Sequence, residues 1–436
     1  MSGFRSVSPE LCKCFRVDTM EILMLLFLHR GCPMSKTPLF IRFIRPTYGG
    51  YLRWRYKIKT VGLEHLNGLK GPYLVLSNHV HVLDPFMISS VWPDHIRWVA
   101  GAYLFRLKIV GFLLSKLVTG IAKQQGRSDY QTIKDISQAF KKGDVVGLFP
   151  EGTRTWDGEA LPFDITTAKL VRMFHVPVVL INLEGGYGLK PRWATHAREG
   201  QLTIRVFKPI GEGEILAMKL SELHASIGSV LNFSYNAWQE EHRIPFESEH
   251  AAEGLQRVLY MCPQCNQRSS IITEYKSVCC SSCNASSMVD AFDNLVPVDG
   301  KTPFRFNDIP SWHQWEKDQI KHLVDTSDVE LFPPDRGEVF QAGVGRRFLK
   351  KLSVDFTVTL RPHAIIINRN DMLGTDHIGT DKQFIFDFED IRSLILNAKG
   401  TIELFFGDKL FRIQLHRSCS TLKYLEFFEA CKEART

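Results

Sequence analysis

The chain has 436 residues, of which 44% are apolar and 23% are charged. These proportions exclude a disordered or collagen-like protein, and the length allows two or three domains that each bury a core of their own. The formal net charge of +7 is small for this length, but it is unevenly distributed along the chain.

Residues 1–60 combine an apolar run with a basic, aromatic segment. The run "MEILMLLFLH" is about half as long as a bilayer-spanning helix, so we expect a surface-docking helix. Between residues 31 and 63 there is no acid but there are seven cations, namely Lys36, Arg42, Arg45, Arg53, Arg55, Lys57 and Lys59, among six aromatic residues. This mixture suits an anionic membrane surface, although nucleic acid or plain solvent would also accommodate it. We therefore expect residues 1–60 to dock on a membrane.

From residue 71 onwards, short apolar runs alternate with helical patterns. "PYLVLSN", "VVGLF", "PVVLINL" and "LTIRVFK" predict strands, and residues 128–141 predict a helix by their apolar stripe. This order predicts an α/β domain at residues 61–245, with a central, mostly parallel sheet and helices on its faces. Ligands bind outside the carboxyl ends of such strands, where "NHVHVLD" and "PEGTRT" both lie.

Cysteines cluster after this domain. Cys262 and Cys265 form one Cys-x2-Cys step, and Cys280 and Cys283 form a second after fourteen intervening residues. Four thiolates at this spacing predict a zinc ribbon at residues 258–290 that holds one structural zinc with no coordination position left for catalysis. Cys279 is an alternative to Cys280. Cations are sparse around the cysteines, so no nucleic acid is expected and a stabilising or partner-docking role is favoured.

Residues 328–436 change to a β-rich pattern. A helix beginning near Trp312 links the ribbon to five predicted strands, "DFTVTLRP", "HAIIINR", "QFIFDF", "TIELFF" and "KLFRIQL". An amphipathic helix, "STLKYLEFFEACKEA", ends the chain. By its order of elements this barrel-like domain resembles pleckstrin-homology or GRAM domains.

Two histidines and one aspartate follow the first predicted strand. His79 and Asp84 would point roughly 140° apart on a regular helix, so they can meet only if His79 lies in the turn before a helix and Asp84 within its first turns. A histidine held by a carboxylate is a competent general base, but a structural pair is the commoner case. His81, three residues before Asp84, is the other candidate.

The motif "LFPEGTRT" lies about seventy residues later, at the end of another predicted strand. Gly152 permits close backbone approach, and the guanidinium of Arg154 suits a phosphate. A base that faces a phosphate-binding loop indicates group transfer onto a phosphorylated alcohol, although "PEGT" alone is also typical of a plain turn.

Together, "NHVHVLD" and "FPEGTRT" resemble the His-x4-Asp and FPEGTRS motifs of the glycerolipid acyltransferase family, which includes 1-acylglycerol-3-phosphate acyltransferases. "GPYLVLSNH" and "PVVLINLEG" extend the likeness over residues 56–209. The resemblance implies transfer of a fatty acyl group from acyl-CoA or acyl carrier protein to a glycerol hydroxyl. His79 would be the base and Asp84 its orienting partner.

The resemblance also implies that Glu151, Gly152, Thr153 and Arg154 bind the glycerol phosphate. One family feature is missing, because "GIAKQQGRSD" has glutamines where basic residues are expected. Lys123 or Arg127 would then supply the charge, which leaves the acceptor open between a lysophospholipid, first of all 1-acylglycerol-3-phosphate, and glycerol 3-phosphate.

We therefore expect a peripheral membrane acyltransferase on the cytoplasmic face. Its partners would be the membrane surface, the lysophospholipid and the acyl donor. The alternative class is a non-catalytic adaptor that binds lipid or nucleic acid.

Overall fold

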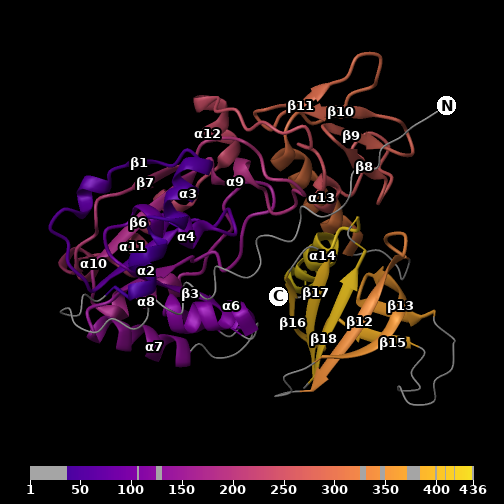
Figure 1. The fold of residues 1–436 in the computed structure, drawn as a ribbon. Helices are drawn as coiled ribbons and strands as arrows, with labels where there is room; N and C mark the ends of the chain where they lie inside the picture. Colours follow the sequence, from indigo (N-terminus) through magenta and orange to yellow (C-terminus); the bar gives the residue numbers. More distant parts are fainter. Residues whose placement is uncertain are drawn as a thin grey trace, which may run out of the picture.

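The computed structural model describes residues 37–105, 108–123, 130–324, 330–343, 349–370, 383–397, 400–407, 409–416 and 418–434. Three parts follow one another in Figure 1: an α/β domain, a small ribbon and a C-terminal antiparallel domain. Most of the predicted docking segment, residues 1–36, lies outside the described residues, and so does Arg127.

The α/β domain is built on a seven-stranded sheet of order β1-β7-β6-β2-β5-β3-β4. Its strands are β1 (Lys59–Val61), β2 (Tyr73–Ser77), β3 (Ile96–Gly101), β4 (Ile121–Lys123), β5 (Val145–Leu148), β6 (Val178–Glu184) and β7 (Thr203–Val206). All neighbouring pairs are parallel except β6 and β7, so the prediction of a mostly parallel sheet is confirmed and the sheet is mixed. Residues 185–202 connect β6 to β7, and the one-turn helix α9 (Gly186–Leu189) is the only helix among them. A parallel pairing would need a full crossover there.

Helices cover both faces of this sheet, and β2 alternates between them. Tyr73 and Val75 pack in the same core as α3 (Tyr48–Arg55) and α4 (Asp84–Val91), whereas Leu74 and Leu76 pack in the core under α7, α8 and α11. The other helices of the domain are α2 (Leu39–Ile44), η2 (Leu63–Leu66), α5 (Ala102–Phe105), α6 (Lys108–Phe112), η3 (Leu113–Leu117), α7 (Tyr130–Lys141), α8 (Thr166–Phe174), α10 (Glu212–Ala217), α11 (Leu220–Leu231) and α12 (Tyr235–His242). Because strand side chains alternate, a strand buried on both faces reads as the continuous apolar run seen in the sequence.

The ribbon is a four-stranded antiparallel sheet of order β11-β10-β9-β8. After the short helix η4 (Leu255–Arg257) come β8 (Ile271–Glu274), β9 (Ser277–Cys280), β10 (Ser286–Val289) and β11 (Leu295–Pro297). One Cys-x2-Cys step precedes β8, and the other follows directly from the end of β9. The two steps therefore lie at the same end of the ribbon.

The C-terminal domain is a seven-stranded antiparallel sheet of order β15-β14-β13-β12-β18-β17-β16. Its elements are β12 (Asp335–Gly343), β13 (Lys350–Arg361), β14 (Ala364–Arg369), β15 (Gln383–Asp387), β16 (Ile391–Leu396), β17 (Thr401–Phe406), β18 (Lys409–Leu415) and α14 (Leu422–Glu433). Phe386 of β15 packs against Phe406 and Phe411 of β17 and β18, so the sheet curls toward a barrel. The five predicted strands and the helix are confirmed. β12 and β16 are two strands that the prediction lacked.

Helix α13 (Ile309–Val324) follows the ribbon and packs against α14 between the α/β domain and the C-terminal sheet (Figure 1). Its His313 donates to Asp157 of the α/β domain through Nδ1 and to Glu426 of α14 through Nε2, both at 2.6 Å. We call this contact the interdomain bridge. Within the described residues, no helix is both long and apolar enough to cross a bilayer.

Candidate functional site

His79 and Asp84 meet at the carboxyl end of β2. His79 lies in the turn after the strand, and Asp84 is the first residue of α4. One oxygen of Asp84, Oδ2, accepts hydrogen bonds at 2.8 Å from Nδ1 of His79 and from the backbone N–H groups of Val80 and His81. The carboxylate of Asp84 therefore both shapes the turn and orients the imidazole of His79. His79 lies in the turn and Asp84 in the first turn of the helix, as the sequence argument required.

The ring of His79 stacks on Phe149 with ring centroids 4.2 Å apart, and Phe149 stacks on Trp98 at 4.8 Å. The backbone of His79 is fixed as well, because its N–H donates to Glu151 at 2.9 Å and its carbonyl accepts from Thr155 at 3.2 Å. The two sequence motifs are thus joined at one edge of the sheet, and the imidazole has little freedom to rotate.

His81 has a different environment. It is 1% exposed, its Nδ1 accepts the N–H of Leu83 at 3.0 Å, and its ring lies edge-on to Tyr56. Burial lowers the pKa of His81 to about 4, although the nearby Asp84 acts in the opposite direction. His81 is therefore a neutral, buried histidine that helps to shape the turn.

Glu151 connects two loops. Its Oε1 accepts the N–H of His79 and its Oε2 accepts the N–H of Leu161 at 3.3 Å. Burial raises the pKa of Glu151 to about 8, against the two N–H groups that favour its ionised form. These contacts give Glu151 a positioning task, and its binding to a phosphate stays a prediction.

Gly152, Thr153 and Arg154 line a cavity of about 960 Å³ that His79 and Lys123 also line. Gly152 has a φ of +70°, a conformation that glycine adopts without strain. Lys123 is the last residue of β4. Gly152, Thr153, Arg154 and Lys123, four predicted site residues, therefore line the same cavity as His79. Arg127 is outside the described residues.

Arg192 belongs to this site although the sequence analysis missed it. Its Nη1 donates to Oγ1 of Thr153 at 2.8 Å and to the carbonyl of Arg154 at 3.1 Å, and its guanidinium lies over the ring of Trp156 at 4.1 Å. Arg192 thus holds the loop after β5 in place. Its partner Thr153 is 39 residues away, and no local pattern marks such a contact.

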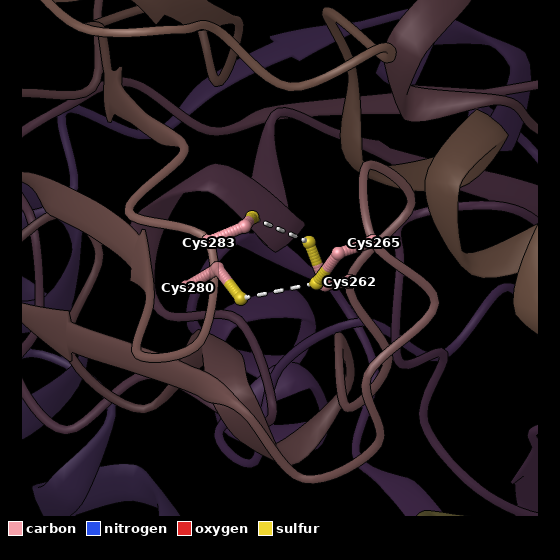
Figure 2. A group of neighbouring side chains, drawn as sticks. All are labelled: Cys262, Cys265, Cys280 and Cys283. Atoms are coloured by element: carbon pink, nitrogen blue, oxygen red, sulfur yellow. Dashed lines mark hydrogen bonds between the residues drawn. The ribbon is translucent and has the colours of Figure 1, made fainter.

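The four predicted cysteine ligands come together in the ribbon, as Figure 2 shows. The four Sγ atoms lie within 4.8 Å of one another, with 3.7 Å between Cys262 and Cys283 and between Cys265 and Cys280. A tetrahedron with Zn–S bonds of 2.3 Å has sulfur–sulfur edges of about 3.8 Å. Cys279 instead contacts Oγ of Ser286 at 3.1 Å. The geometry therefore fits zinc, with Cys280 rather than Cys279 in the group.

Comparison with known proteins covers the α/β domain. Residues 57–184 match the model of the acyltransferase family. The chain is 27% identical over 210 residues to a chloroplast 1-acyl-sn-glycerol-3-phosphate acyltransferase of Brassica napus, covering 46% of this chain and 60% of that protein. It is 27% identical over 170 residues to the Saccharomyces cerevisiae enzyme of that name, covering 38% and 55%. The chain therefore spans less than two thirds of the length of these relatives.

A solved structure of similar type is the 1-acyl-sn-glycerophosphate acyltransferase PlsC from Thermotoga maritima. It is 18% identical, with a TM-score of 0.40, and the match covers 51% of this chain and 87% of that one. The predicted likeness to glycerolipid acyltransferases is confirmed as a likeness over residues 57–184, a stretch that contains "NHVHVLD" and "FPEGTRT".

The raised pKa of Glu151 predicts a pH-dependent stability. In the unfolded chain this carboxyl group ionises above its ordinary pKa of 4.5, whereas in the folded protein it keeps its proton to about pH 8. Its contribution to stability is therefore present below about pH 4.5 and is lost as the pH rises to about 8. A Glu151→Gln variant has no ionisable group at this position, so its stability does not fall in this way as the pH rises. We expect the variant to gain roughly 3–4 kcal/mol relative to the wild type between about pH 5 and pH 8, at about 1.4 kcal/mol per pH unit.

Thermal unfolding followed by circular dichroism across this pH range measures the effect. Glu64→Gln, which removes an exposed carboxylate in η2, is the control and should follow the wild type. A constant difference between Glu151→Gln and the wild type across the range would contradict the prediction.

Proposed function

We propose that the protein is an acyltransferase of glycerolipid synthesis, with 1-acylglycerol-3-phosphate as acceptor and acyl-CoA or acyl carrier protein as donor. The observation that carries this proposal is the His79–Asp84 pair, because His79 lines the same cavity as Gly152, Thr153 and Arg154. The relatives named above carry this activity in their names, and the acyltransferase match contains the pair and the loop.

The proposed mechanism follows from the tautomer that Asp84 selects. With Nδ1 donating to Asp84, Nε2 of His79 is left to accept a proton. His79 takes the proton of the acceptor hydroxyl while that oxygen attacks the thioester carbonyl carbon. The tetrahedral intermediate then expels the thiolate as the C–S bond breaks, and His79 returns the proton to the sulfur. No acyl-enzyme forms, so no serine or cysteine nucleophile is needed.

The acceptor's phosphate would lie beside Arg154 and Lys123, which bring positive charge to the cavity. Thr153 would add a hydroxyl that Arg192 orients. Lys123 would thus replace the basic residues that the glutamines at positions 124 and 125 do not provide. Glycerol 3-phosphate or another lysophospholipid would fit the same charges, so an acceptor panel must choose among them.

His79 and His81 offer a matched pair of substitutions. We expect His79→Asn to lower the turnover at least about a hundredfold, because a general base contributes that much or more. His81→Asn keeps an oxygen near the position of Nδ1 that can accept the N–H of Leu83, and should stay within severalfold of the wild type.

An assay with 1-acylglycerol-3-phosphate, glycerol 3-phosphate and other lysophospholipids, each with acyl-CoA and acyl carrier protein donors, measures both variants. Equal losses in the two variants would refute the assignment of His79. A wild-type chain that transfers no acyl group to any acceptor would favour the non-catalytic adaptor.

Zinc is proposed to bind Cys262, Cys265, Cys280 and Cys283. With four protein thiolates its role would be structural, joining the two turns at one end of the ribbon.

The adjacent cysteines test this proposal. We expect about one zinc per chain in the wild type and in Cys279→Ser, and loss of zinc together with a lower melting temperature in Cys280→Ser. Elemental analysis by mass spectrometry and a thermal unfolding curve are the measurements. Loss of zinc in Cys279→Ser but not in Cys280→Ser would refute the ligand set. A metal-free wild type of normal stability would refute it as well.

Membrane docking is supported by exposed apolar side chains of α2 and α3. We use the name aromatic face for Leu39, Phe43, Tyr48, Tyr51 and Trp54, all of which are exposed; Tyr48 contacts Tyr51, and Tyr51 contacts Trp54, which is 75% exposed. The aromatic face continues through the Tyr48–Phe86 contact onto α4, whose first residue holds His79.

Three of the predicted cations have structural tasks. Arg45 donates to the backbone carbonyls of Pro93 and Asp94, Arg53 donates to that of Ser90, and Arg55 donates to that of Arg198. Arg42, Lys57 and Lys59 are exposed and could meet anionic headgroups. The proposed arrangement is a peripheral protein that turns its aromatic face to the cytoplasmic membrane surface.

We expect a Tyr51→Ser/Trp54→Ser variant to bind phosphatidylserine vesicles at least about tenfold more weakly, because each large apolar side chain favours burial by about 1.5–3 kcal/mol. Co-sedimentation with vesicles measures the binding. The control is Tyr130→Ser/Tyr275→Ser, which removes two exposed aromatic residues elsewhere. Unchanged binding of the first variant would move the anchor to residues 1–36 or to the apolar segment of α5, α6 and η3.

A further inference from the structure

The cavity that contains His79 is not enclosed by the acyltransferase-family segment alone. Its far side is formed by α13, β16 and α14, all of which follow residue 184, where the family match ends. From α13 the cavity is lined by Gln314, Lys317, Ile320 and Lys321. From the C-terminal domain it is lined by residues 393–397 and by one side of α14. The site thus has a wall that the family segment does not supply.

This wall is fastened to the loop beside His79. Nη1 of Arg192 donates to the hydroxyl of Thr153 and to the carbonyl of Arg154. Its Nη2 donates to the carbonyl of Leu396 in β16 at 2.8 Å. One buried guanidinium therefore joins the loop after β5 to the C-terminal domain. The interdomain bridge is a second link, which starts at Asp157, three residues after Arg154. The wall has a fixed position relative to the base.

Where the C-terminal domain forms the wall, apolar lining residues lie beside polar ones, which are Ser393, Asn397, Glu426, Glu429 and Glu433. Leu394, Ile395 and Leu396 of β16 line the cavity, as do Leu422, Leu425 and Ala430 of α14. Opposite them, the α/β domain contributes apolar lining residues such as Val99, Leu104 and Leu148. The apolar residues that both domains contribute suit a hydrocarbon chain, and the volume of about 960 Å³ lies at the upper end of ordinary ligand cavities.

We propose that the C-terminal domain completes the active site and forms one wall of a pocket for a fatty acyl chain, so that β16 and α14 set the chain length that the enzyme accepts. This inference rests on the proposed function for the reaction, but it adds the ligand and the residues that select it. The occupant is a long acyl chain, which belongs either to the donor thioester or to the lysolipid acceptor.

Leu425 is the residue of choice for a test because it is partly buried and faces the cavity. We expect Leu425→Trp to lower the ratio of palmitoyl to octanoyl turnover at least about tenfold, because each methylene denied burial costs about fourfold. Ile395→Trp, on β16, should shift the ratio in the same direction. The control is Ile385→Trp, which changes an exposed residue of β15 at the opposite edge of the same sheet and should leave the ratio unchanged.

The assay has two arms. In the first arm the acceptor is fixed and palmitoyl-CoA is compared with octanoyl-CoA. In the second arm the donor is fixed and oleoyl and octanoyl lysophosphatidic acids are compared. A shift confined to one arm supports the proposal and identifies whose chain the pocket holds, and a shift in both supports a pocket shared by the two chains. Unchanged ratios in both arms for both tryptophan variants overturn the proposal.

Binding separates this inference from the proposed function. The fluorescent fatty acid cis-parinaric acid is titrated into the full-length wild type, His79→Asn and the tryptophan variants. We expect His79→Asn to bind like the wild type, and Leu425→Trp and Ile395→Trp to bind at least about tenfold more weakly. This result would stand even if the chain transferred no acyl group. Equal binding by wild type and both tryptophan variants would overturn the pocket while leaving the reaction untouched.

Discussion

The arrangement of the domains depends on one buried ion-pair network, the interdomain bridge, in which His313 joins Asp157 to Glu426. Burial alone would lower the pKa of His313, but the two carboxylates outweigh burial and raise it to about 10. The imidazole is therefore a cation at neutral pH, and each of its nitrogens donates to an acid from a different part of the fold. Glu426 also accepts a hydrogen bond from the hydroxyl of Tyr260 at 2.5 Å. Tyr260 lies just before the first strand of the ribbon, so the ribbon belongs to the same network. Three units with separate sheets thus share one hydrogen-bonded cluster.

A buried ion pair is weak support for stability as such, because desolvation offsets the attraction. Its strength lies in the penalty for separating its members, which is about 3–5 kcal/mol when one charge is left alone. Arg192 works in the same way, since its guanidinium is shared by the loop after β5 and by the carbonyl of Leu396. These contacts give the α/β domain and the C-terminal domain one preferred arrangement. A cavity formed between two domains keeps a defined shape only under that condition.

The parts of the site that sequence reasoning predicted are those whose partners are near in the chain. His79 and Asp84 are five residues apart, so backbone geometry alone limits how they meet. The cysteine steps are likewise local, and the parallel pairing of β2 with β5 follows from the α/β order. His313 contacts residues that are 156 and 113 positions away, and no periodicity records such a distance. β12 was missed for another reason: its sequence "DRGEVFQAG" contains charges and glycines, and its place between β13 and β18 comes from pairing.

The residues near His79 therefore fall into two groups with different physical origins. The turn that holds the base is self-contained, because Asp84, Glu151 and their N–H partners all belong to the family segment. The opposite wall is supplied by elements that lie more than two hundred residues further along the chain, and long-range charge contacts hold it in place. A base needs fixed geometry whatever substrate it serves, whereas a wall decides which substrates fit. Added domains can therefore alter the selectivity of such a site while the hydrogen bonds of its base remain the same.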